Sequence, residues 1–127
     1  MLRLALCDDD ATFRRLLRAL LSAQHDMQVV GESCEGRGCI EQVLRDRPDA
    51  VLLDLSMPGM SGLEAIPELV EAAPRTTIIV LSAEDPGRVE PVVRGLGAAA
   101  FIPKAERGLV DTLPRRIRSV VATRPAV

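Results

Sequence analysis

The chain has 127 residues and a mass of 13.7 kDa, the size of one ordinary domain, which excludes a two-domain enzyme or a receptor with its own output module. Hydrophobic residues make up 47% of the sequence and charged residues 27%, so we expect the chain to fold around a normal core. A net charge of −2, the absence of Trp and Tyr, and only two Phe argue against nucleic-acid binding through phosphates or by base stacking.

Short apolar runs alternate with longer amphipathic segments along the chain. In chain order, the expected elements are a strand over residues 2–7, a helix over 13–21, a strand over 27–31, a helix over 36–46, a strand over 50–53, a helix over 61–73, a strand over 76–81, a helix over 87–96, a strand over 98–102 and a helix within 107–122. The runs at 51–53 and 78–81 are continuously apolar, which is typical of parallel strands buried on both faces. The pattern therefore predicts an α/β fold in which helices cover both faces of a parallel sheet.

Three of the expected helices contain a proline. Proline lacks an amide donor and bends or breaks a helix unless it lies in the first turn. Pro114 fits the first helical position if the last helix begins near Thr112. Pro67 and Pro91 have no such place, and we expect kinks or late helix starts there.

The cysteines and the single histidine do not have the pattern of a metal site. Cys7, Cys34 and Cys39 lack the spacing of zinc ligands, and His25 cannot complete a site with them. We expect reduced, mostly buried thiols and therefore a cytoplasmic location. The apolar stretch at the N-terminus is too short for a signal peptide, and no run is long enough to span a membrane, so we expect no membrane contact.

Polar residues stand where the expected strands end. Asp8, Asp9 and Asp10 follow the first strand, Asp54 the third and Ser82 the fourth, while Lys104, the only lysine beside 15 arginines, follows the fifth. Because the carboxyl ends of parallel strands meet at one edge of a sheet, we expect most of these groups to lie together. Asp10 is expected to cap the next helix instead.

The chemistry of this group points to phosphoryl transfer. Crowded carboxylates need a cation, and hard oxygen ligands suit Mg²⁺, which is often shared with a phosphate. A metal ion, an ammonium and a hydroxyl around one carboxylate are typical of a phosphoryl-transfer site. Asp54 is the expected nucleophile, because Met57-Pro58-Gly59 follow it and no helix begins there for it to cap.

Four motifs, LCDDDATFRRLL, DAVLLDLSMPGMSGLEAI, TTIIVLSAED and AAAFIPKAE, resemble those of response-regulator receiver domains of bacterial two-component signalling. The resemblance covers nearly the whole chain. It implies a doubly wound (βα)5, flavodoxin-like fold with a five-stranded parallel sheet in the order 2-1-3-4-5. It also implies a receiver domain over residues 1–122, with 123–127 as a C-terminal tail or the start of a linker.

The resemblance implies that Asp54 is the phosphoacceptor and that Mg²⁺, or Mn²⁺ in its place, is the cofactor. Asp9 and Asp54 would bind the metal directly, together with the backbone carbonyl of Ser56, and Asp8 would act through water. The family uses the positions of Ser56 and Glu84 to control how water reaches the acyl phosphate. Here Ser56 is small and Glu84 is acidic, so the resemblance does not fix the lifetime of the phosphoryl group.

The same resemblance implies a switch. Ser82, Lys104 and the backbone of Ala83 would bind the phosphoryl group, and Phe101 would swing inward on activation. The surface of the fourth helix, fifth strand and fifth helix would then signal the change. The implied partners are a sensor histidine kinase and, after phosphorylation, a second copy of the chain.

The stretch VVGESCEGRGCIEQVLRDRPDAVLLD is similar to receivers that carry a C-terminal helix-turn-helix domain. It implies control of transcription, with DNA reached only through an output domain that is absent here. We therefore expect an excised receiver rather than a free-standing one. We also expect no enzyme activity beyond self-phosphorylation and weak autophosphatase activity.

Two alternatives remain open at this point. Asp8-Asp9-Asp10-Ala11-Thr12 fits the D-x-D-x-T motif of haloacid-dehalogenase-type phosphatases, which would use Asp8 and Asp10. That reading gives Asp54 no role and finds no late acidic pair for the metal. The second alternative is a degenerate receiver that acts only as an interaction module, which the complete set of site residues disfavours.

Overall fold

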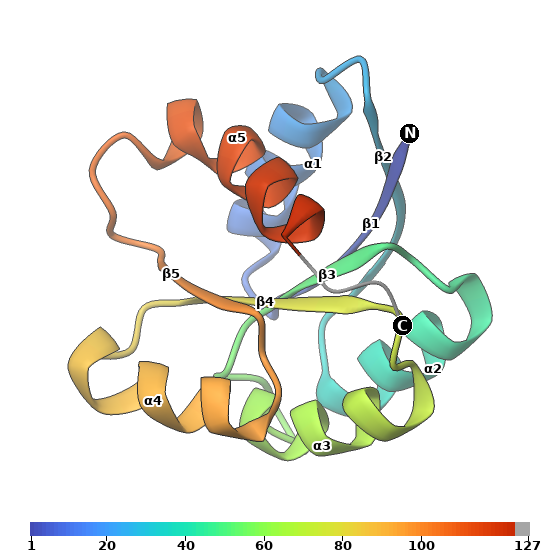
Figure 1. Cartoon of the computed structure of the whole chain (residues 1–127), viewed down its shortest axis with the longest axis vertical. Helices are drawn as coiled ribbons and strands as arrows, with labels where there is room; N and C mark the ends of the chain where they lie inside the picture. Colours follow the sequence, from blue (N-terminus) through green and yellow to red (C-terminus); the bar gives the residue numbers. More distant parts are fainter. Residues whose placement is uncertain (124–127) are drawn as a thin grey trace.

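The computed structural model describes residues 1–123, which form one five-stranded sheet with five helices (Figure 1). The strands are β1 (Leu2–Cys7), β2 (Met27–Ser33), β3 (Ala50–Leu53), β4 (Thr77–Ser82) and β5 (Ala100–Pro103). The helices are α1 (Ala11–Ser22), α2 (Gly36–Asp46), α3 (Gly62–Ala72), α4 (Pro86–Leu96) and α5 (Leu109–Ala122). All paired strands are parallel, in the order β2-β1-β3-β4-β5, which confirms the expected fold class and strand order. Apart from Thr123, the expected tail over 123–127 lies outside the described residues.

The sheet separates two apolar cores. Figure 1 shows α1 and α5 on one face of the sheet and α2, α3 and α4 on the other. Side chains alternate along β1, so that Leu4 and Leu6 face α1 and α5, whereas Ala5 and Cys7 face the other three helices. The four residues of β3 are all buried, as expected for a central parallel strand. This central position places the residue after β3 at the middle of the sheet edge.

Three helices begin at side-chain caps. Asp10 Oδ1 accepts the backbone N–H groups of Thr12 and Phe13, which confirms its predicted capping role. Ser61 and Glu64 form a capping box at α3 by binding each other's backbone N–H groups. Asp85 Oδ1 caps α4 by accepting the backbone N–H of Gly87. These caps fix where α1, α3 and α4 start relative to the strand ends that precede them.

Three strands differ in extent from the prediction. β2 continues to Ser33 instead of ending at residue 31, β4 covers Thr77–Ser82 instead of 76–81, and β5 begins only at Ala100 instead of residue 98. Gly97 turns the chain in a left-handed conformation, with φ of 121°, and only then does β5 pair with β4. Ser82 is thus the last paired residue of β4. Its pairing with β5 holds its backbone more firmly than a position in a loop would.

All three prolines lie inside unbroken helices, so the expected late helix starts are wrong, as is the placement of Pro114 at a first helical position. Pro67, Pro91 and Pro114 are each the sixth residue of their helices. The carbonyl that each proline leaves without a helical donor therefore belongs to the second residue, namely Leu63, Gly87 and Val110. These residues are partly or fully exposed, so water can bind the freed carbonyls.

Two of the three cysteines are joined, which corrects the expectation of reduced thiols and removes it as a ground for a cytoplasmic location. Cys7, the last residue of β1, and Cys39 of α2 form a disulfide, with Cα atoms 5.8 Å apart and both residues fully buried. Cys34 is free and exposed. The prediction failed because a thiol count carries no information on which side chains converge in the fold.

Alkylation of the unfolded chain without reductant should label one cysteine, Cys34, and prior reduction should raise the number to three. Unfolding exposes every thiol, so only a covalent bond can protect Cys7 and Cys39. Intact mass measures both states directly. Three labels without reductant would contradict the disulfide.

Within residues 1–123, none of the helices is both long enough and apolar enough to span a membrane.

Candidate functional site

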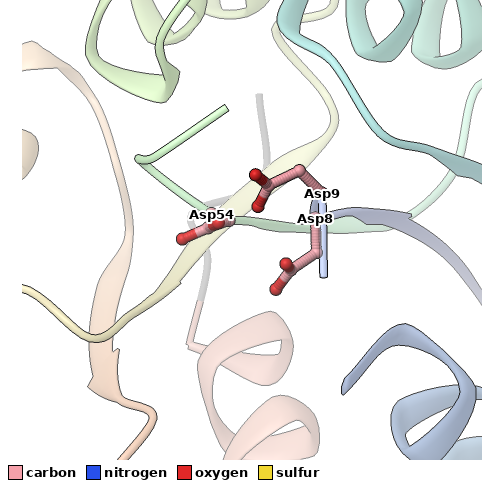
Figure 2. A group of neighbouring side chains, drawn as sticks. All are labelled: Asp8, Asp9 and Asp54. Atoms are coloured by element: carbon pink, nitrogen blue, oxygen red, sulfur yellow. The ribbon is translucent and has the colours of Figure 1, made fainter. Parts of the chain in front are cut away.

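Three carboxylates meet at the edge of the sheet where β1 and β3 end. Asp8 and Asp9 follow β1, and Asp54 follows β3 directly. Figure 2 shows their side chains gathered around these strand ends, and one carboxylate oxygen from each lies within 4.8 Å of the others. The predicted convergence of the strand ends is therefore what the fold produces. Asp8 and Asp54 are buried, whereas Asp9 is exposed, so the group opens to solvent on the side of Asp9.

Lys104 brings the one ammonium of the chain into this group. Its Nζ lies 2.8 Å from Asp8 Oδ2 and 3.8 Å from Asp54 Oδ2, and its side chain is only 17% exposed. Asp8 also accepts the backbone N–H of Asp10 on its other carboxylate oxygen, at 2.9 Å. Asp8 is thus held by two donors, and the ammonium is bound more closely to Asp8 than to Asp54.

The surroundings of Asp54 disfavour the ionised form of its carboxyl group. Burial, followed by repulsion from Asp8, raises its pKa from 3.8 to about 6, although Lys104 and the backbone N–H of Ser56 oppose this rise. A buried anion beside other anions is stabilised by any cation that reaches it. The site therefore favours binding of a divalent cation through hard oxygen ligands.

The backbone around Asp54 is fixed from two sides. Its N–H donates to the carbonyl of Cys7 at 2.8 Å, which ties the end of β3 to the end of β1. On the other side α3 approaches closely, because a Cβ on Gly62 would lie 2.5 Å from the Asp54 carbonyl oxygen. Only glycine permits this contact without a shift of the backbone. The backbone position of Asp54 is consequently fixed on both sides.

Asp10 does not join the acidic group. Its carboxylate is occupied by the backbone of α1, and it is not among the three residues that converge. The phosphatase alternative requires Asp10 beside Asp8 as an acid–base residue. The structure gives Asp10 a structural role instead, and this alternative is not supported.

The strand end of β4 supplies the neighbouring groups. Ser82 is fully buried, its Oγ accepts the backbone N–H of Glu84 at 3.0 Å, and its carbonyl accepts the backbone N–H of Lys104 at 2.8 Å. Ala83 follows it and is exposed. The carboxylate of Glu84 is bound by Arg88, one helical turn further on, at 3.2 Å. Ser56 is exposed in the loop after Asp54.

Phe101 already lies inside the protein. It is 3% exposed and packs in the core with Val80, Val89 and Val93. The resemblance implies an aromatic side chain that moves inward on activation, and the ring has this inward orientation here.

Two residues of α1 also lie near the site. The ring of Phe13 lies 4.6 Å from the ammonium of Lys104, and Arg14 donates to the carbonyl of Asp8 and to Glu32. In the sequence, Phe13 is the first residue of the expected helix over 13–21. Its position three residues after Asp10 was the available signal, because the first turn of a helix that follows a strand faces the same edge of the sheet.

A family model described as the response regulator receiver domain matches residues 4–113. The chain belongs to this family. The match covers most of the chain and includes residues of all five strands, so it also confirms the resemblance seen in the motifs.

Individual relatives agree with this membership. The transcriptional regulatory protein YxjL of Bacillus subtilis is 36% identical over 118 residues, which are 91% of this chain and 50% of that protein. A protein-glutamate methylesterase/protein-glutamine glutaminase of Nocardioides is 32% identical over 126 residues, which are 97% of this chain but 34% of the relative. The crystal structure of the response regulator domain of Thermotoga maritima CheB has 28% identity and a TM-score of 0.91, over 98% of this chain and 99% of that one. The chain thus spans half or less of these curated relatives but nearly all of an isolated receiver domain.

Mg²⁺ binding should weaken as the pH falls through about 6, because protonation of Asp54 removes one of the converging carboxylates. Each further pH unit should cost up to about tenfold in affinity, and raising the pH above this value should bring no further gain from Asp54. Titration calorimetry of the receiver at a series of pH values measures the effect. The control is Asp54→Asn, which should bind weakly without this pH step. Equal affinity of the parent protein on both sides of the step would contradict the assignment.

Proposed function

We propose that the chain takes a phosphoryl group from the phosphohistidine of a sensor histidine kinase onto Asp54 and thereby changes its affinity for partners. The observation that carries this proposal is the buried Asp54 carboxylate, grouped with Asp8 and Asp9 and lying 3.8 Å from the only lysine. Such a group of anions with one ammonium is suited to hold a phosphoryl group together with a metal.

The cofactor is proposed to be Mg²⁺, with Mn²⁺ as a substitute. Asp9 and Asp54 are the proposed direct ligands, with the carbonyl of Ser56, and Asp8 is proposed to act through water. The donor set fits this metal, because it consists of oxygen atoms and leaves one side open toward Asp9, which is exposed. When bound, Mg²⁺ neutralises charge on the phosphoryl oxygens during transfer.

The proposed transfer is an in-line displacement. A carboxylate oxygen of Asp54 attacks phosphorus, the bond from phosphorus to the histidine nitrogen breaks, and the imidazole leaves with a proton taken from solvent. Asp54 then carries an acyl phosphate. Lys104 is close enough to shift from Asp8 toward the new dianion, since its distances to the two carboxylates differ by only 1.0 Å, that is 3.8 less 2.8.

The proposed switch follows from this new charge. Rotation of the Ser82 hydroxyl toward the phosphoryl group would release the backbone N–H of Glu84, which Ser82 now binds. The loop that begins at Ala83 would then move and carry the start of α4 with it. The surface formed by α4, β5 and α5 is the proposed signalling face. We propose that this loop moves first and that Phe101, which packs with Val89 and Val93 of α4 in the core, fills the space that the loop vacates.

Ser56 and Glu84 are proposed to set the lifetime of the acyl phosphate. Ser56 leaves space for water beside Asp54, because it is small and exposed. The Glu84 carboxylate is paired with Arg88 at 3.2 Å, and this pairing is proposed to keep it from activating water. A neighbouring Arg88→Ala change would release it and test this part of the proposal.

The biological setting is also proposed. The similarity to YxjL favours control of transcription, with DNA contacted only by a separate output domain and no binding of nucleic acid or membrane by the receiver itself. We propose residues 1–122 as the receiver, with residues 123–127 as tail or linker, a cytoplasmic location, a homodimer after phosphorylation, and no enzymatic turnover beyond weak autophosphatase activity.

The test is intact mass after incubation with acetyl phosphate and Mg²⁺. The parent protein should gain the mass of one phosphoryl group, and Asp54→Asn should gain none. Asp10→Asn is the matched control, because asparagine keeps the helix cap, and it should react like the parent. Phosphorylation of Asp54→Asn at the parental rate would overturn the proposal, and loss in Asp10→Asn alone would revive the phosphatase alternative.

A further inference from the structure

The ammonium of Lys104 has an aromatic neighbour as well as two anions. Its Nζ lies over the ring of Phe13, 4.6 Å from the ring centroid, while it binds Asp8 at 2.8 Å. The face of an aromatic ring carries partial negative charge and attracts a cation at this distance. The ring therefore covers one side of the ammonium that water would otherwise hydrate.

Both members of this contact are held in place by independent anchors. Phe13 lies in the first turn of α1, where its backbone N–H donates to Asp10 Oδ1 at 3.1 Å, and its ring packs against the core beneath α1 and α5. Lys104 is anchored by its backbone N–H, which donates to the carbonyl of Ser82. The ring is thus fixed relative to the sheet edge, and the flexible lysine side chain adapts to it.

We propose that Phe13 is a positioning residue, which holds the ammonium of Lys104 within reach of the phosphoryl group on Asp54. This role rests on the proposed function. The ammonium must leave Asp8 when a phosphoryl group arrives, and a second strong anion in its path would trap it. The ring attracts the ammonium more weakly than a carboxylate does, so it limits the excursions of the side chain without opposing the shift toward Asp54.

The contact is assigned to positioning because the ring touches no proposed reacting atom. Its effect must therefore pass through Lys104 and must disappear when Lys104 has no charge. A purely structural role in the core would instead persist without the ammonium. This difference separates the two explanations by a double-mutant cycle.

The experiment measures the rate of phosphorylation by acetyl phosphate with Mg²⁺ for Phe13→Leu, Phe13→Tyr, Lys104→Met and Phe13→Leu combined with Lys104→Met. Phe13→Leu keeps an apolar side chain but lacks the ring, and the rate should fall about fivefold, as expected for a partly buried cation–π contact. Phe13→Tyr keeps the ring and should stay within about twofold of the parent. In the Lys104→Met background, Phe13→Leu should change the rate by less than about twofold.

A second measurement does not depend on phosphorylation. Because Lys104 is the only lysine, ¹³C-lysine labelling gives one ε-methylene signal, and the ring should shift it upfield. The shift should vanish in Phe13→Leu and persist in Phe13→Tyr. An unshifted signal in the parent would overturn the contact itself.

The outcomes separate this role from the proposed function. If the parent takes no phosphoryl group, the proposed function fails and the positioning role fails with it. If the parent reacts but Phe13→Leu equals it, only the role of Phe13 is overturned. An equal fall in both Lys104 backgrounds would likewise overturn positioning and leave a structural effect of the ring.

Discussion

Asp54→Asn should make the metal-free protein more stable at neutral pH by about 2–3 kcal/mol. The pKa of Asp54 is raised from 3.8 to about 6 by burial and by Asp8, so ionisation of this carboxyl group lowers the free energy of unfolding. This destabilisation is absent below the pKa of 3.8 in the unfolded chain, grows as the pH rises from 3.8 to about 6, and is complete above about 6. The gain in the free energy of unfolding should therefore vanish in acid.

Urea unfolding with a chelator, at neutral and acidic pH, measures this gain. Mg²⁺ should stabilise the parent and close most of the difference, because it binds the folded state through the same carboxylate. Asp10→Asn is the control for a change from carboxylate to amide at an exposed cap, and it should show no such pH dependence. A less stable Asp54→Asn protein at neutral pH would contradict the account of a crowded, buried anion.

Lys104→Met should have the opposite effect and destabilise the metal-free protein by about 2–3 kcal/mol. The change leaves Asp8 buried without its ionic partner at 2.8 Å, and it removes the one cation that offsets the raised pKa of Asp54. Loss of one partner from a fully buried ion pair costs about 3–5 kcal/mol, and partial exposure of Lys104 reduces this cost. Phosphorylation should also become slower, since the ammonium no longer stabilises charge during transfer.

Mg²⁺ should restore most of the stability of Lys104→Met, because a divalent cation replaces the missing charge. Arg107→Met, which removes an exposed charge three residues further along, should change the free energy of unfolding by no more than about 0.5 kcal/mol. Urea unfolding with and without Mg²⁺ compares the two variants. Equal, small effects of both changes would show that Lys104 is not part of the site.

The sequence predicted the convergence of the acidic residues and Lys104 because these residues stand at strand ends. In a parallel sheet the carboxyl ends share an edge, so a few assigned strands were enough to bring Asp8, Asp54 and Lys104 together. Strong apolar runs in the sequence indicated those strands. The predicted strand bounds were wrong by one or two residues, but this did not move Asp8, Asp54 or Lys104 to another edge of the sheet. Ser82 moved from a loop into β4 without leaving the site.

Features that depend on three-dimensional packing were not predictable in the same way. The bond between Cys7 and Cys39 requires knowledge that α2 packs over the end of β1. The prolines were misjudged because their cost depends on whether the freed carbonyl reaches water, which the sequence does not state. The contact of Phe13 with Lys104 joins residues from opposite ends of the chain, and only the fold brings them together.

The most direct test of the central claim is to locate the phosphoryl group chemically. Borohydride reduces an aspartyl phosphate to homoserine, which peptide mass spectrometry assigns to one position. After reaction with acetyl phosphate and Mg²⁺, we expect homoserine at residue 54 and unmodified Asp8, Asp9 and Asp10. Homoserine at residue 8 would contradict the account, because it would make the end of β1, rather than the end of β3, the phosphoacceptor.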